Sequence, residues 1–475
     1  MKIVPFVAAV ALTCWSCATN PATGKRQIIL MSEQEEIQLG RQSDAEIRKQ
    51  MGVYKDDALQ KYVADVGAKL ARAAHRPTLP WTFTVVDEQA VNAFALPGGF
   101  VYITRGILPF LRSEAELAAV MGHEVGHVDA RHGAQAYSKQ TLAGVGLAVG
   151  GLLVPQAQAL QGVTSAALQL AFLKNGRSNE LEADHLGVGY AATSGWDPRA
   201  VPSLLSTLGR LDEASGSSRG VPNWALTHPP ADDRVEKVQA AVATAMSPTA
   251  IATNGPEFER HLDGLVFGDS REKGIVRGTE FLHPILRFAM KFPAQWEVSN
   301  GEAQVSARPA ESTNAAMILQ LSDGTGSVRD LAAAQMTRAG WTSVSGQGTS
   351  INGLEAYVGT YEGVMDNTRV TIQAAHVRSG QQVYVIAGVA PSPAFRGFES
   401  EFANAIRSFR PLSKEEADRI QPNRVDFYVV RAGDTWESLA RSSGAVKAST
   451  LAIMNGSQLA TPPMAGQRIR VVVGG

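Results

Sequence analysis

Apolar positions recur mainly at helical spacing over residues 28–245, so this stretch is predicted to be mostly helical. The segments 81–86 and 91–103 interrupt it with runs rich in β-branched and aromatic residues, which predict the strands of a small sheet. Ser113, with a glutamate three residues later, predicts the start of a helix after these strands. We expect that helix to end at Gly133.

Strand-like runs replace the helical pattern over residues 256–412, after a change of composition near residues 247–255. The expected strands are 286–292, 316–321, 368–377 and 383–389, and the expected helices are 327–339 and 398–409. This pattern predicts a separate α+β domain without a catalytic constellation, and its role is not revealed by the sequence. A connector rich in lysine and glutamate, 413–423, follows it.

The first seventeen residues have the composition of an export signal. One positive charge precedes an apolar run, 3–12, which is too short to span a bilayer but suits the core of a signal peptide. The two cysteines of the chain, Cys14 and Cys17, both lie at its end. This arrangement predicts a bacterial lipoprotein signal over 1–17, cleaved so that Cys17 carries lipid, and simple secretion is the alternative. Residues 18–27 would then be a linker.

Composition limits the remaining classes of protein. With 475 residues, 44% hydrophobic and 19% charged, the chain can bury the cores of several domains. Its net charge of −1 provides no field that would attract nucleic acid, so we expect no nucleic-acid partner. Two apolar runs, 144–154 and 163–173, are each shorter than a membrane span. We expect buried helices there, and the alternative is a helical hairpin against a membrane or partner.

The segment His123-Glu124-Val125-Gly126-His127 lies late in the helix that Ser113 is expected to start. Positions i and i+4 share a helix face, so His123 and His127 can hold one metal ion together. Neutral imidazole nitrogens suit zinc. Glu124 lies beside them, where it can take a proton from the attacking water.

Zinc needs a third protein ligand. His132 does not stand at the spacing of the long metzincin pattern, so we expect it to be structural, facing solvent or a carbonyl near the helix end. Glu180 and Asp184 are better candidates, because their i, i+4 spacing on a second helix puts them on one face. One of them can bind the metal while the other accepts a hydrogen bond from a ligand imidazole, and we favour Glu180 as the ligand. Glu182 is expected to point elsewhere.

The His-Glu-Val-Gly-His segment, followed by the Glu-Leu-Glu-Ala-Asp of 180–184, resembles the gluzincin metallopeptidases of the HtpX, BepA and CAAX-prenyl-protease type. The resemblance covers 28–245. It implies one zinc ion per chain, with Glu180 as the third ligand. Residues 92–99 also match the strand and turn that precede the active-site helix of this family. Such a strand can pair with an extended substrate, and the expected substrate-binding residues are Asn92, Ala93, Phe94 and Ala95.

A further match to this family is Thr227-His228-Pro229-Pro230, with Arg234 six residues after the histidine. His228 is either a structural loop residue or a residue over the zinc. In the second case it would stabilise the developing oxyanion, or it would occupy the open coordination site and hold the enzyme shut. We include His228 among the catalytic candidates, together with Glu124 and Asp184.

The C-terminal residues 426–473 resemble a LysM module. The matching positions are Tyr428-Val429-Val430, Gly433-Asp434-Thr435, Leu439-Ala440, Leu451, Asn455, Pro463, Gly466-Gln467 and Ile469. The resemblance implies a βααβ fold that binds N-acetylglucosamine polymers such as peptidoglycan. Residues 433–435 also suit the entry to a helix, so they can be structural even if the module binds glycan.

These patterns predict a multidomain α+β protein with a mainly helical peptidase domain, an α+β middle domain and a βααβ module. The expected function is a lipid-anchored zinc metalloendopeptidase that hydrolyses proteins at the periplasmic face of the envelope. Ala18, rather than aspartate, follows Cys17, which favours the outer membrane. The alternatives are a hydrolase of peptidoglycan peptides and a non-enzymatic assembly or chaperone factor. The complete set of His123, Glu124, His127 and Glu180 disfavours the last.

Overall fold

The structure is a computed structural model. It describes residues 17–150, 170–171, 175–215, 224–228, 234–245, 253, 255–301, 303–310, 314–322 and 325–475. The chain forms two compact units, the first made of residues 1–267 with 424–474, and the second of residues 268–423 with 475. These bounds differ from the expected ones. Residues 256–267 belong to the first unit, and the expected connector 413–423 belongs to the second.

Helix α4 (Glu114–Asp129) is the centre of the first unit, and all of its residues are buried. The side chain of Ser113 accepts a hydrogen bond from the backbone of Glu116 and starts the helix as predicted. The predicted end at Gly133 is wrong, because Arg131 adopts a left-handed φ of 60° and breaks the helix earlier. Its guanidinium donates hydrogen bonds to Glu36 (2.8 Å) and to the carbonyl of Met31 (3.0 Å), which hold this turn.

Helix α7 (Arg177–Thr193) packs closely against α4 because small residues line their contact. Gly122 of α4 faces Gly187 of α7, and Gly126 faces Ala183. A Cβ atom built on Gly126 would lie 2.9 Å from the carbonyl oxygen of Ala183, so a side chain larger than hydrogen does not fit. This approach brings the acidic residues of α7 next to the histidines of α4.

The small sheet of the first unit has the order β3-β5-β4. Strand β5 (Phe100–Thr104) pairs in parallel with β3 (Thr82–Val86) and antiparallel with β4 (Ala93–Leu96). The strands expected in 81–86 and 91–103 are confirmed, and the second segment folds into two strands. Gly98 and Gly99 take φ values of 84° and 104° in the turn between them, which favours glycine. In the order β3-β5-β4, strand β4 lies at an edge of the sheet.

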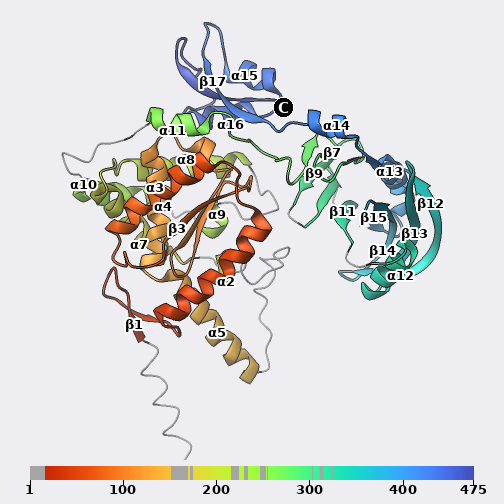
Figure 1. Ribbon diagram of the computed structural model, residues 1–475, viewed down its shortest axis with the longest axis horizontal. Helices are drawn as coiled ribbons and strands as arrows, with labels where there is room; N and C mark the ends of the chain where they lie inside the picture. Colours follow the sequence, from red (N-terminus) through yellow and green to blue (C-terminus); the bar gives the residue numbers. More distant parts are fainter. Residues whose placement is uncertain are drawn as a thin grey trace, which may run out of the picture. The chain divides into compact units, whose positions relative to one another are not determined.

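Helices α3, α5, α7, α8 and α11 of the first unit contact α4 (Figure 1). No helix among the described residues is both long and apolar enough to cross a membrane. Residues 144–150 of the first apolar run form the end of α5, whereas residues 151–154 and most of the second run, 163–173, lie outside the described residues. The remaining elements are the hairpin β1 (Cys17–Thr19) with β2 (Arg26–Ile28), helices α2 (Glu33–Met51), α3 (Asp57–Ala73), α5 (His132–Gly150), α8 (Ala200–Ser215), α9 (Trp224–Thr227), α10 (Arg234–Ala245) and α11 (Gly255–Leu262), and the short 3₁₀ helix η2 (Leu108–Phe110).

The C-terminal module, residues 424–474, has the element order βααβ and packs on the rest of the first unit. Its buried Arg470 donates hydrogen bonds to the carbonyls of Pro109 (3.1 Å) and Leu111 (2.5 Å). Phe110 enters its hydrophobic core. The module is thus held directly before the start of α4. Its elements are β17 (Arg424–Val429), α15 (Trp436–Ser443), α16 (Ala448–Met454) and β18 (Arg468–Val473).

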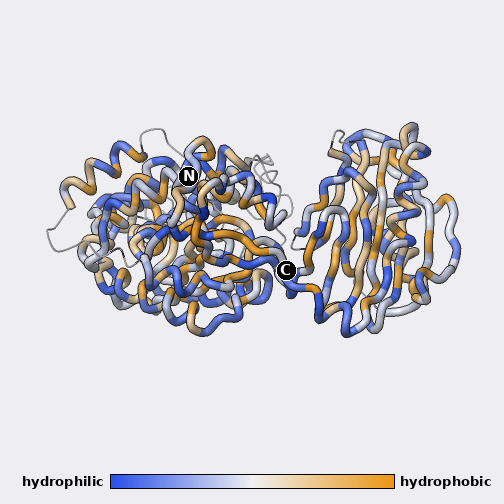
Figure 2. Tube along the Cα trace, turned by 90° about the horizontal axis from the view of Figure 1, so that it is seen from above, coloured by the Kyte–Doolittle hydropathy of each residue, from blue (hydrophilic) through white to orange (hydrophobic). Residues whose placement is uncertain are grey.

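The second unit is built on a seven-stranded antiparallel sheet with the order β12-β13-β14-β15-β11-β10-β9. Hydrophobic and polar segments alternate along its strands (Figure 2), and a helix covers each face. Phe402 of α13 packs with Ala375, while Met336 of α12 packs with Ala374 on the opposite face.

A second, four-stranded sheet in this unit has the order β16-β8-β7-β6. The strands of the second unit are β6 (Ile275–Arg277), β7 (Glu280–His283), β8 (Phe288–Lys291), β9 (Trp296–Asn300), β10 (Val305–Pro309), β11 (Ala316–Leu321), β12 (Thr342–Ile351), β13 (Leu354–Met365), β14 (Thr368–Ser379), β15 (Gln382–Pro391) and β16 (Arg410–Pro411). Its helices are α12 (Val328–Arg338), α13 (Phe395–Ser408) and α14 (Lys414–Arg419). The expected α+β composition of the middle domain agrees with this arrangement.

Candidate metal centre

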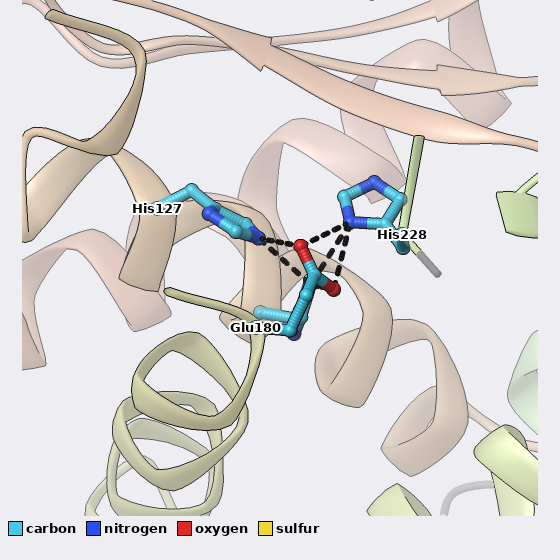
Figure 3. A group of neighbouring side chains, drawn as sticks. His127, Glu180 and His228 are labelled. Carbon is cyan, nitrogen blue, oxygen red and sulfur yellow. Dashed lines mark hydrogen bonds and ion pairs between the residues drawn. The ribbon is translucent and has the colours of Figure 1, made fainter. Parts of the chain in front are cut away.

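Four buried side chains meet beside the sheet of the first unit, and we call them the four-residue cluster: His123, His127, Glu180 and His228. The first two come from α4, Glu180 comes from the first turn of α7, and His228 directly follows α9. One candidate ligand atom from each lies within 4.8 Å of all the others. Figure 3 shows the carboxylate of Glu180 between the rings of His127 and His228.

The spacing of these atoms suits one zinc ion. The Nε2 atoms of His123 and His127 lie 2.9 Å apart, and Nδ1 of His228 lies 3.2 Å from Nε2 of His123. Glu180 places its oxygens 3.3 Å from His127 Nε2 and 3.3 Å from His228 Nδ1. Ligands at about 2.0–2.1 Å from a tetrahedral zinc ion would stand roughly 3.4 Å from one another. The donor types, imidazole nitrogen and carboxylate oxygen, are also those that zinc prefers.

Asp184 and Arg234 surround the cluster with buried charges. Asp184 lies behind His123, with its Oδ1 atom 2.9 Å from the Nδ1 atom of that ring. Arg234 donates two hydrogen bonds of 2.8 Å to Asp184, and its Nη1 atom lies 3.1 Å from Glu180. One guanidinium therefore compensates both buried carboxylates, a partnership that the spacing of Arg234 from His228 did not reveal.

His132 is fully buried, and it faces neither solvent nor a carbonyl as we had expected. Its Nδ1 atom lies 2.9 Å from Nδ1 of His127, and its Nε2 atom lies 3.1 Å from Oε2 of Glu182. The turn at Arg131 directs the chain back along α4, which brings this imidazole behind the metal-facing histidine.

Comparison with known proteins agrees with this geometry. Residues 57–242 match the model of peptidase family M48. This part of the chain is a peptidase family M48 domain. The chain is 33% identical over 229 residues to the beta-barrel assembly-enhancing protease of Escherichia coli strain K12, an alignment that covers 46% of each chain. It is 34% identical over 188 residues to the mitochondrial metalloendopeptidase OMA1 of Arabidopsis thaliana, covering 39% of this chain and 37% of that one.

A putative beta-barrel assembly-enhancing protease of Vibrio cholerae is 34% identical over 197 residues, which is 40% of each chain. The chain thus spans about half the length, or less, of these relatives.

Electrostatics in the M48 domain favour binding of a cation. Burial opposes charge on His123, but its contacts with Asp184 and Glu180 raise its pKa to about 9, so these carboxylates favour a positive charge at this ring, and a bound zinc ion would displace its proton. Burial keeps the pKa of His127 well below its ordinary range, so this ring is neutral. Burial would raise the pKa of Glu180, but the neighbouring His228 and His127 hold it well below its usual value. A neutral imidazole and a charged carboxylate are the forms that bind zinc.

Glu124 and the edge strand β4 border a cavity at the cluster. Phe94 and Ala95 of β4 line it together with Glu124, His127 and His228. Burial raises the pKa of Glu124, and its Oε1 atom lies 3.4 Å from Nε2 of His228. The apolar Leu170 and Ala171, which sequence reasoning had not singled out, form another part of the lining.

Two of the four expected substrate-binding residues do not line this cavity. The side chain of Asn92 is buried and accepts a hydrogen bond of 2.9 Å from the backbone of Ala93. The carbonyl of Ala93 lies 3.4 Å from Nε2 of His228. Trp224, also absent from the sequence prediction, stacks on His228 with ring centroids 4.1 Å apart and helps to hold it over the cluster.

Proposed function

We propose that this chain is an exported zinc metalloendopeptidase that hydrolyses peptide bonds of proteins at the bacterial cell envelope. The observation that carries the proposal is the buried four-residue cluster beside Glu124 in an M48 domain. His123, His127 and Glu180 would hold the zinc ion.

The chemistry follows from the groups around the cavity. Zinc, when bound, polarises a carbonyl group and makes water more acidic. Glu124 would accept the proton of the attacking water and deliver it to the leaving amine. Its raised pKa, caused by burial, brings this carboxylate closer to the pH at which it works as a base and then as an acid. Asp184 would hold the ring of His123 through the contact of 2.9 Å at Nδ1.

The substrate would bind as an extended peptide along β4. In the part of the chain that the structure describes, β4 is the last strand of its sheet, and an added strand would run past Phe94 and Ala95. An unfolded segment can extend along β4 in this way, whereas few segments of a folded domain are free to do so. We therefore propose unfolded or misfolded envelope proteins as the substrate class.

His228 is proposed to hold the site shut in the arrangement described. Its Nδ1 atom lies 3.2 Å from His123 and 3.3 Å from Glu180, among the atoms that would bind the metal. A histidine in that position would occupy the coordination place that water or substrate needs. The alternative role is stabilisation of the oxyanion.

The proposed location is the periplasmic face of the envelope, with a lipid on Cys17 as the anchor in the outer membrane. The support is the signal-like pattern of residues 1–17, together with the bacterial relatives whose names refer to β-barrel assembly. The C-terminal module is proposed to bind peptidoglycan, on the basis of its resemblance to LysM and its βααβ element order.

Incubation of the zinc-loaded chain with an unfolded protein and with purified peptidoglycan sacculi tests the proposal. We expect the wild type to cut the unfolded protein and Glu124→Gln to bind zinc without cutting it. Release of peptides from sacculi alone would favour the second candidate, a peptidoglycan hydrolase, which the C-terminal module suggests. Cleavage of neither substrate would contradict the enzymatic proposal.

A further inference from the structure

We infer that His132 and Glu182 are positioning residues of the metal centre, which fix the tautomer and orientation of the ligand His127. The inference rests on the proposed zinc site. The sequence placed neither residue at the metal centre, and their contacts lie behind the ring of His127.

The direction of the hydrogen bonds follows from the metal-facing atom. Nε2 of His127 points into the four-residue cluster, 3.3 Å from Glu180, and must carry a lone pair to bind a cation. The ring hydrogen of His127 is then on Nδ1, which lies 2.9 Å from Nδ1 of His132. His127 donates this hydrogen, and His132 accepts it. His132 therefore carries its own hydrogen on Nε2, which it donates to Glu182 over 3.1 Å.

The burial of His132 leaves His127 and Glu182 as the hydrogen-bond partners of its ring. His132 has no exposed surface, so water cannot replace either partner. The opposite tautomer of His127 would direct a hydrogen at the metal position and would prevent binding. The two ligand histidines are thus supported differently, since His123 contacts the carboxylate of Asp184 directly at 2.9 Å.

The N-terminal hairpin completes this chain of contacts at its outer end. Lys25 lies 3.5 Å from Glu182, and Asn20 donates to the same carboxylate over 3.4 Å. Gln27 of β2 donates a 3.0 Å hydrogen bond to the carbonyl of Ala130, at the end of α4. The segment that directly follows Cys17 therefore packs against Glu182, the outermost of the residues that support His127.

The zinc dissociation constant of the full chain, measured by competition with a chromophoric chelator, tests this role. His132→Phe keeps a ring but removes both hydrogen bonds, and we expect zinc to bind about 10–100-fold more weakly. His185→Phe is the matched control, because His185 lies exposed on α7 near Glu182. Its zinc affinity should equal that of the wild type. The unfolding temperature of each metal-free variant separates lost positioning from lost folding.

Glu182→Gln provides a second test, because this side chain is partly exposed and its amide oxygen still accepts the hydrogen bond of His132. We expect weaker zinc binding than in the wild type, with an unchanged metal-free unfolding temperature. The double variant should bind zinc about as well as His132→Phe alone, since Glu182 acts through His132.

Unchanged zinc affinity in both single variants would overturn the inference. So would a loss of affinity that only follows a loss of folded protein in His132→Phe, with none in Glu182→Gln. His123→Ala distinguishes failure of the zinc site itself. If this variant binds zinc as tightly as the wild type, the proposed metal centre is wrong, whatever His132 does.

Discussion

At the residue scale, the centre is a set of buried polar groups that compensate one another. Glu180 and Asp184 would each be costly to bury alone, and Arg234 contacts both. His123 and His228 approach the carboxylate of Glu180 from different elements. The ligand atoms of the four-residue cluster therefore surround a position that suits a cation.

His228→Ala is predicted to raise kcat/KM for an unfolded protein substrate, while zinc stays bound by the other three residues of the cluster. The reason is that Nδ1 of His228 stands among the ligand atoms, 3.3 Å from Glu180, where it competes with water and substrate. Initial rates at equal zinc content measure this. A fall of about 10²–10³-fold would instead identify His228 as the residue that stabilises the oxyanion.

The sequence predicted the residues whose relationship is local. His123 and His127 meet because the i, i+4 spacing of a helix requires it, and the same spacing pairs Glu180 with Asp184. The contact of His132 was not predictable, because it depends on the left-handed turn at Arg131.

At the element scale, the centre depends on how closely α4 and α7 approach. Gly122 and Gly126 on one helix, with Ala183 and Gly187 on the other, allow the two backbones to approach closely. Helix α4 carries His123 and His127, and α7 carries the third proposed ligand, Glu180, so the distance between the helices sets the distance between these ligands.

Gly126→Ala is predicted to lower the free energy of unfolding of the first unit by about 1–3 kcal/mol. The new Cβ would lie 2.9 Å from the carbonyl oxygen of Ala183, and a backbone atom cannot rotate away. Zinc affinity should fall as well, because the helices must separate.

Gly189→Ala is the control, since a Cβ on this glycine of α7 meets nothing within 4 Å. It should stabilise the helix by up to about 1 kcal/mol and leave zinc binding unchanged. Urea unfolding and chelator competition measure both effects. Equal behaviour of the two variants would show that the helix contact does not control the site.

In the second unit, His376 of β14 is predicted to make stability depend on pH. Burial lowers its pKa from 6.5 to about 4, so the folded unit keeps this ring neutral while the unfolded chain takes up a proton. The contribution of His376 to the free energy of unfolding is therefore fully present above pH 6.5. It is lost as the pH decreases towards 4, and the loss is about 3 kcal/mol at most.

Urea midpoints of the wild type and His376→Gln, compared between pH 7 and 4.5, measure this contribution. His283 shows the same burial effect, with a pKa of about 4, so only the difference between the two proteins belongs to His376. Identical pH dependence in both would contradict the prediction.

Sequence patterns predicted the buried strands of this unit better than its exposed ones. The segment 316–321 matches β11, because alternating apolar residues face the core there. Strand β12 was missed, since nearly all of its residues are exposed and its glycine and serine content is typical of loops.

At the scale of the whole molecule, the compact units do not follow the order of the segments in the sequence. The first unit combines the M48 domain with the C-terminal module, and the second unit is inserted between them in the sequence. A ligand bound by the module would therefore be held at a fixed position relative to α4, because Arg470 contacts the segment 109–111 before that helix.

Arg470→Met is predicted to lower the free energy of unfolding of the first unit by about 1–3 kcal/mol, because two buried carbonyls lose their donor. These are the carbonyls of Pro109 and Leu111. Arg441→Met, at an exposed position of α15, should change it by no more than about 0.5 kcal/mol. Thermal unfolding of the full chain compares them, and equal stability of the two variants would mean that the module packs weakly.

The zinc content of the purified chain tests the central claim most directly. The wild type should contain one zinc ion per molecule, held by His123, His127 and Glu180. Removal of the carboxylate in Glu180→Ala should leave the chain folded but largely free of zinc after dialysis against a weak chelator. A wild type that retains no zinc, or a Glu180→Ala variant that retains as much as the wild type, would contradict the metal centre described above.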